Sequence, residues 1–252
     1  MLGRIVYLLY TAYLLETEHT TTATYADNTA ILASHKNHII VSINLQRHIH
    51  QLEKWLKRWR IKAHENKSTH ITFTLNRETC PSVTLNGQYI PQRETAKYLG
   101  IHLDRRLTWQ KHIFTKRKQL DPQFHRMYWI IGRKSKLPLE TKLLIYKTIL
   151  KSIWTYGIPL WGTANKSNKE ILQMFQNKII RSIVNAPRYV PHTAIHTDLQ
   201  IPTVKAEITN HSTKYREKLI TRPNELIPVL LENEEPRRLK RLKPTVLITR
   251  FL

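Results

Sequence analysis

Hydrophobic and polar residues alternate in the early part of the chain and recur at helical spacing in the later part. Two short runs rich in Thr, Ala and Ile, at 20–24 and 29–32, flank the tetrapeptide Tyr25-Ala26-Asp27-Asn28. A period-two pattern on both sides of a tight turn predicts a β-hairpin, because Asp and Asn tolerate the positive φ that such turns need. From these residues alone, the tip is either an ordinary turn or a rigid mount for a metal-binding carboxylate.

A long amphipathic helix is predicted over 38–59. Its apolar side chains recur at steps of three and four, at Val41, Leu45, Ile49, Leu52, Leu56 and Trp59. Ser34 is a candidate cap for an early start of this helix.

Strand-like segments follow the long helix, at 60–63, 69–75, 82–85, 88–90 and 97–103. Asn86-Gly87 joins the third and fourth of them, and this dipeptide predicts a type I′ hairpin turn. Gly100 lies inside the last segment, where a glycine indicates a bulge or a close backbone approach.

From residue 105 onward the pattern is helical. Helices are predicted over 109–131, 138–155, 168–185, 192–199 and 203–221. Pro122 is expected to bend or split the first of them, and Asn168 is a candidate cap for the third. The chain is therefore predicted to be α+β up to residue 104 and all-helical over 105–221, with a basic, loosely ordered tail over 222–252.

The charge of the chain points to a polyanionic partner. The net charge is +23, yet residues 1–50 contain three basic and three acidic residues, so the whole excess follows residue 50. Such a field favours a nucleic-acid backbone, and the alternative is a solvated basic surface. The candidate contacts are the cations at the start of the helical region, Arg105, Arg106, Lys111, Lys116, Arg117 and Lys118.

Other side chains with chemical potential have an ordinary structural alternative. The tryptophans at 109, 129, 154 and 161 either pack in the core or stack on bases. His192 and His196 share a helix face and form either a surface pair or part of a zinc site for which no third ligand is evident. Cys80, the one cysteine, offers no disulfide partner and points to a reducing, intracellular compartment.

The apolar run over 5–15 imitates a signal peptide, but it is too short to cross a membrane and no small-residue cleavage site follows it. A buried helix fits the same residues. We expect no membrane association.

Several motifs, taken together and in order, resemble the palm of a reverse transcriptase of the jockey-type non-LTR retrotransposons. After Tyr25-Ala26-Asp27 come Trp59-Arg60-Ile61-Lys62, Asn66-Lys67-Ser68 and Tyr98-Leu99-Gly100-Ile101. The resemblance continues with Leu103-Asp104-Arg105-Arg106-Leu107-Thr108-Trp109, Trp154-Thr155-Tyr156-Gly157, Leu160-Trp161-Gly162 and Ile195-His196-Thr197-Asp198-Leu199. It covers nearly the whole chain.

The resemblance implies the later half of a palm at 1–104 and a thumb with its C-terminal extension from residue 105. It implies an RNA-directed DNA polymerase that acts on an RNA and DNA template–primer with Mg²⁺. Together with the single cysteine, it implies a nuclear or cytoplasmic location. Asp27 would be a catalytic metal ligand, and Lys67 would lie near the incoming nucleotide. Tyr98 and Gly100 would form the hairpin that supports the primer terminus.

The sequence departs from the family pattern at the metal site. The motif ends in two aspartates, and here Asn28 occupies the second place. The fingers and the earlier metal-binding Asp are not among the 252 residues. One carboxylate cannot position two Mg²⁺ ions, so we expect no nucleotide transfer by this chain alone. Two other interpretations stay open, a non-catalytic RNA- or DNA-binding remnant and a decayed product without a selected role.

Overall fold

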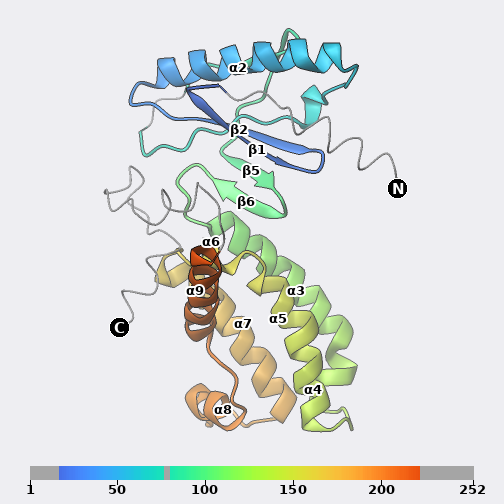
Figure 1. Cartoon of the computed structure of the whole chain (residues 1–252). Helices are drawn as coiled ribbons and strands as arrows, with labels where there is room; N and C mark the ends of the chain where they lie inside the picture. Colours follow the sequence, from blue (N-terminus) through green and yellow to red (C-terminus); the bar gives the residue numbers. More distant parts are fainter. Residues whose placement is uncertain (1–16, 77–79, 222–252) are drawn as a thin grey trace. The chain divides into compact units, whose positions relative to one another are not determined.

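A computed structural model describes residues 17–76 and 80–221. These residues form two compact units, with the boundary between Arg106 and Leu107. The first unit combines hairpins with a long helix and the second is helical (Figure 1), which confirms the α+β class. The predicted tail over 222–252 and the apolar run over 5–15 lie outside the described residues.

The first hairpin forms where the alternation predicts it. Strand β1 (Thr20–Tyr25) pairs antiparallel with β2 (Asn28–Ala33), and Tyr25 lies opposite Asn28. Ala26 and Asp27 therefore make a two-residue turn. One face of the hairpin packs against helix α2 (His38–Arg58), which lies across it (Figure 1).

Helix α2 connects the first hairpin to the rest of the unit. The buried His48 ring lies near two threonine hydroxyls of the first segment, with Nδ1 2.6 Å from Thr20 Oγ1 and 3.1 Å from Thr17 Oγ1. Asn37 caps the helix by accepting a hydrogen bond from the Ile39 amide at 2.8 Å, so the prediction of Ser34 as the cap is wrong. Asn37 satisfies an amide of the first turn that the helix itself cannot.

The opposite edge of α2 holds a second, very short hairpin. Strands β3 (Thr84–Leu85) and β4 (Gln88–Tyr89) flank Asn86 and Gly87, whose φ values of 50° and 77° are those of the predicted type I′ turn. The Gln46 side chain donates to the Thr84 carbonyl at 3.0 Å and accepts from the Thr84 amide at 2.7 Å. It thus pairs with the edge of β3 as a neighbouring strand would.

A small apolar core fills the space between α2 and this hairpin. Its buried members are Ile49, Val83 and Leu85, and its partly buried members are Leu45, Ala63 and Ile90.

Three predicted strands differ from the structure. Residues 61–64 have no regular structure, and within 69–75 only an isolated bridge forms, between His70 and Gln92. The segment 97–103 is a hairpin and not one strand, since β5 (Thr95–Tyr98) turns into β6 (Ile101–Asp104). Leu99 and Gly100 form the turn, with φ values of 46° and 76°, so Gly100 marks a reversal of the chain and not a bulge.

The second unit is built from helices joined by short connections. They are α3 (Gln110–Ile131), α4 (Leu139–Ile145), a π-helical turn (Tyr146–Leu150), α5 (Lys151–Thr155), α6 (Ile158–Trp161), α7 (Lys166–Val184), α8 (His192–Asp198) and α9 (Val204–Ile220).

Two predicted helix signals act differently from expectation. Pro122 does not split α3, which is continuous through it. The ring is exposed, so water can satisfy the carbonyl that proline leaves without a partner. The cap of α7 is Asn165, and Asn168 lies inside the helix with its side chain donating to the Thr108 carbonyl at 3.1 Å.

Aromatic side chains form much of the core of the helical unit. Trp154 and Trp161 are each 1% exposed, with ring centroids 6.4 Å apart. Trp109 is also buried, and its Nε1 donates to Thr163 Oγ1 at 2.8 Å. These three tryptophans pack in the core, whereas Trp129 is 76% exposed.

A buried ion pair joins two helices of this unit. Lys151 of α5 contacts Oε1 of Glu207 on α9, and Glu207 is 5% exposed. His211 Nε2 lies 3.6 Å from the other carboxylate oxygen. Removal of the Lys151 ammonium group would leave the buried Glu207 carboxylate with His211, at a longer distance, as its other ion-pair partner.

We expect Lys151→Met to lower the free energy of unfolding by about 2–3 kcal/mol, somewhat less than for a fully enclosed pair because the lysine is partly exposed. Lys147→Met, at an exposed position of the preceding turn, is the matched control and should change stability by at most about 0.5 kcal/mol. Urea unfolding followed by circular dichroism measures both. Equal stability of the two variants would contradict the structural role of the pair.

Burial of His48 makes the first unit sensitive to acid. Desolvation lowers the pKa of His48 below its ordinary value of 6.5. The unfolded chain therefore binds a proton more readily than the folded one below this pH. The resulting stability is complete above pH 6.5 and is lost as the pH falls through the lower folded pKa. The protection factors of the α2 amides, which correct exchange rates for the intrinsic effect of pH, should fall over this range. His48→Gln should flatten the dependence, whereas His19→Gln at an exposed site should not.

Candidate functional site

The Asp27 turn projects from the end of the β1–β2 hairpin into solvent. Tyr25, Ala26, Asp27 and Asn28 are all exposed. The strands on either side fix the position of the turn, because their register is unbroken from Thr20–Ala33 to Tyr25–Asn28. The carboxylate is therefore rigidly mounted and accessible, as a metal ligand must be.

The backbone of the turn differs from the expected one in a detail. Positive φ belongs to Ala26, at 50°, and neither Asp27 nor Asn28 adopts it. An alanine in the left-handed region costs roughly 1–2 kcal/mol. The two Asx residues are therefore not present to relieve backbone strain, and their side chains are available for other interactions.

The side chains of the turn interact with each other. Asn28 Nδ2 donates to Asp27 Oδ1 at 3.2 Å. Within residues 17–76 and 80–221 there is no group of three or more His, Cys, Asp or Glu side chains that could hold a metal ion. The residues present thus do not fit a two-ion site, which needs several carboxylates from separate segments.

Lys67 lies in a short 3-10 turn, Glu65–Lys67, that is tied to the β3–β4 hairpin. Asn86 Nδ2 donates to Glu65 Oε1 at 2.8 Å, and the Asn86 amide donates to Glu53 Oε1 at 2.5 Å. The bond from Asn86 is the main reason that the pKa of the Glu65 carboxyl is lowered. Lys67 itself is exposed. The Asn86 turn thus fixes the segment that carries Lys67 to α2.

The hairpin that contains Tyr98 and Gly100 contacts the first hairpin. The Tyr98 hydroxyl donates to the Ala23 carbonyl of β1 at 3.5 Å, a long hydrogen bond. The structure therefore places the β5–β6 turn and the strand that leads to Asp27 side by side. Sequence reasoning did not predict this contact, since 75 residues separate Ala23 from Tyr98.

Some of the predicted basic contacts have structural partners, and some face solvent. Arg105 belongs to the first group, because it pairs with Glu94 Oε1 at 3.3 Å and donates to the Asn76 carbonyl. Arg106 is exposed.

The four candidates on α3 divide in the same way. Arg117 pairs with Asp121 and lies over the Phe175 ring, with its guanidinium carbon 4.4 Å from the ring centroid. Lys116 Nζ lies 5.1 Å from the centre of the Tyr156 ring. Lys111 and Lys118, by contrast, are exposed on the outer side of the helix. The cations that follow one another in the sequence therefore form two sets in the structure. Lys116 and Arg117 contact other side chains, and Lys111 and Lys118 face solvent.

The outer side of α3 also carries aromatic side chains that the sequence analysis did not assign to a surface. Phe114 is 45% exposed, and Trp129 is the most exposed tryptophan described above. The signal was available, since both residues lie at helical spacing from Lys111 and Lys118.

The histidine pair on α8 is occupied by protein contacts. Arg181 Nη2 lies 3.2 Å from His192 Nδ1, and His196 contacts the Ile201 carbonyl at 2.7 Å and Asn177 Oδ1 at 3.0 Å. Both nitrogens of His196 thus have partners, which favours the structural interpretation of this pair.

Cys80 is a buried free thiol.

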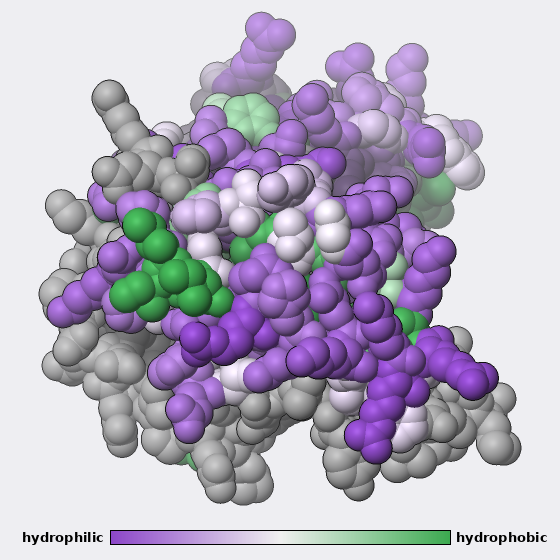
Figure 2. All heavy atoms as spheres, turned by 90° about the horizontal axis from the view of Figure 1, so that it is seen from above, coloured by the Kyte–Doolittle hydropathy of each residue, from purple (hydrophilic) through white to green (hydrophobic). Residues whose placement is uncertain are grey.

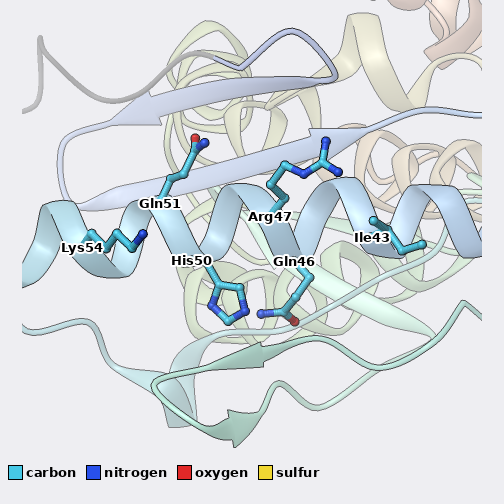
Figure 3. Close-up of a pocket in the computed structure, with 6 residues that line it drawn as sticks. All are labelled: Ile43, Gln46, Arg47, His50, Gln51 and Lys54. Atoms are coloured by element: carbon cyan, nitrogen blue, oxygen red, sulfur yellow. The ribbon is translucent and has the colours of Figure 1, made fainter.

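A shallow hollow on the outer face of α2 carries polar side chains but no carboxylate (Figure 3). It is lined by Ile43, Gln46, Arg47, His50, Gln51 and Lys54. Near the start of the same helix, Ile39, Ile40 and Ile43 are exposed, and Figure 2 shows a compact hydrophobic group on an otherwise mostly hydrophilic face. The hollow includes no residue of the Asp27 turn.

None of the helices in the described part of the chain combines the length and the apolar character needed to cross a membrane.

Comparison with known proteins finds a family and several relatives. Residues 2–103 match the family model of the reverse transcriptase (RNA-dependent DNA polymerase). The chain is 36% identical, over 99% of its length, to a probable RNA-directed DNA polymerase from transposon X-element of Drosophila melanogaster. It is 36% identical over 88% of its length to the RNA-directed DNA polymerase from mobile element jockey of that species, and 32% identical over 91% to that of Drosophila funebris.

The chain spans 28% of the X-element protein, 25% of the jockey protein of Drosophila melanogaster and 26% of that of Drosophila funebris. No solved structure matches it. The matched family segment includes the hairpin with its Asp27 turn and all of the adjoining β5–β6 hairpin except Asp104. Residues 2–103 therefore belong to the reverse transcriptase family, and the chain is related, over most of its length, to the RNA-directed DNA polymerases of X-element and of mobile element jockey.

Proposed function

We propose that this chain is a nucleic-acid-binding segment of a mobile-element RNA-directed DNA polymerase and does not transfer nucleotides by itself. The observation that carries the proposal is the Asp27 turn, where one carboxylate stands beside the Asn28 amide. The family generally uses divalent metal ions, and two-ion phosphoryl transfer needs oxygen ligands from several carboxylates.

The other candidate residues fit supporting roles in a complete site. Lys67 is exposed on a segment that the Asn86 turn holds against α2, so its charge could meet a nucleotide phosphate. Tyr98 and Gly100 form a turn beside β1 and could support a primer end near Asp27. Asp27 remains a candidate Mg²⁺ ligand, and completion of the site would require carboxylates from elsewhere.

The chain alone is expected to incorporate no labelled dNTP on a primed RNA template with Mg²⁺ or Mn²⁺. The assay is primer extension, with an active reverse transcriptase as positive control and Asp27→Ala as the matched variant. Asn28→Asp, which restores the family pair, should also be inactive because other carboxylates are still needed. Incorporation above the level of Asp27→Ala would overturn the proposal.

Nucleic-acid affinity is supported by the charge of the helical unit. Lys111 and Lys118 have no structural partner of the kind that engages Lys116 and Arg117, and both face solvent. The chain as a whole carries a net charge of +23. Phosphate contacts by such lysines release counterions and make binding depend on salt. RNA and DNA are both candidate ligands on this basis.

Binding to a single-stranded oligonucleotide should weaken as salt rises. Joint substitution of Lys111 and Lys118 by Gln should reduce the slope of log affinity against log salt by about 1.4, because each phosphate contact contributes about 0.7 on a single strand. Gln at Lys214 and Lys218, two exposed lysines of α9, is the matched control. Fluorescence anisotropy at several salt concentrations measures the slope, and a salt-independent affinity would refute phosphate contact.

A further inference from the structure

The exposed side of α3 carries one continuous line of cationic and aromatic side chains. We call it the α3 stripe, and its members are Lys111, Phe114, Lys118, Pro122, His125 and Trp129. The steps between them are three, four, four, three and four residues, so all six lie on the same side of the helix. All six are exposed. The buried residues of α3 lie on the opposite side, at His112, Ile113, Leu120, Phe124 and Ile131.

The aromatic members of the stripe are not part of the core. Phe114 is 45% exposed and Trp129 is 76% exposed, while Trp154 and Trp161 are 1% exposed. Two large rings on one helix face, open to solvent, represent unburied apolar area that a ligand can cover. Their π-faces can stack on nucleobases.

The charge of the stripe is uniformly positive or neutral. The acidic residue of α3, Asp121, lies at the edge of the stripe, three residues after Lys118 and four before His125, and it pairs with Arg117. Arg126 is exposed beside the stripe. A phosphate backbone that follows the helix would therefore meet Lys111 and Lys118, while the charge of Asp121 is offset by its pair with Arg117.

We propose that a single-stranded nucleic acid lies along the α3 stripe, with bases stacked on Phe114 and Trp129 and phosphates held by Lys111 and Lys118. This inference rests on the nucleic-acid binding proposed above and adds the form of the ligand. Bases within a duplex are covered by their neighbours, so both rings can stack only where bases are unpaired. The two rings are 15 positions apart, about 22 Å along the helix, which a stacked strand at about 3.4 Å per nucleotide spans in six or seven nucleotides.

The test compares three ligands whose strands all have the same length and therefore the same number of phosphates per strand. They are a uridine dodecamer, a dodecamer of the same length with abasic sugars, and a 12-base-pair duplex. Fluorescence anisotropy with the full chain, at one salt concentration, gives the affinities. Trp129→Ala and Phe114→Ala should each weaken uridine binding about 5- to 150-fold, which is the range for loss of one stacked base. Trp129→Phe should restore part of the loss.

The controls separate stacking from misfolding and from charge. Tyr189→Ala removes another exposed ring, 86% exposed and in the connection between α7 and α8, and should change binding less than twofold. The abasic strand should bind the wild-type chain weakly and should be insensitive to Trp129→Ala. The unfolding midpoint of Trp129→Ala should equal that of the wild type, because the ring is exposed.

Uridine binding that is unchanged in Trp129→Ala and Phe114→Ala would overturn the inference, as would an equal loss on the abasic strand or the duplex. In either case a salt-dependent affinity that needs Lys111 and Lys118 would leave the proposed nucleic-acid binding intact. Absence of any salt-dependent binding would refute both.

Discussion

The first unit depends on α2, one helix that binds both flanking hairpins through side chains on two of its faces. His48 meets the threonines of the β1 region, and Gln46 pairs with the edge of β3. Neither two-stranded hairpin could persist alone in water. The position of Asp27 therefore depends on contacts made by buried and half-buried residues of α2, more than 15 positions further along the chain.

Sequence reasoning reached the elements whose signals are local and missed those that depend on pairing partners. The Asn86-Gly87 turn and the amphipathic period of α2 were sufficient, because each acts over a few neighbouring residues. Segment 69–75 alternates like a strand but forms only the bridge between His70 and Gln92 and a hydrogen bond from the Thr74 amide to the Arg105 carbonyl. Its hydrogen bonds depend on where a distant segment lies, which alternation does not encode. The turn at Leu99 was hidden because leucine gives no sign of a positive φ.

The candidate site shows the same limit. Asp27 could be singled out from a short motif, and its poor fit to two ions could be reasoned from Asn28 alone. The cations could not be sorted, because Lys116 and Lys118 are nearly adjacent in sequence and only packing directs one toward Tyr156 and the other toward solvent. Exposure of Trp129, in a chain whose other helical-unit tryptophans pack inside, follows from tertiary structure as well.

The hydrogen bond from Asn28 to Asp27 affects how stable the turn is when no metal ion is bound. Two adjacent carboxylates repel each other and rely on a cation for relief. An amide beside one carboxylate removes that repulsion and supplies a donor instead. The tip of the hairpin therefore needs no cation to relieve repulsion between its side chains, and the turn can keep the same conformation with or without a metal ion.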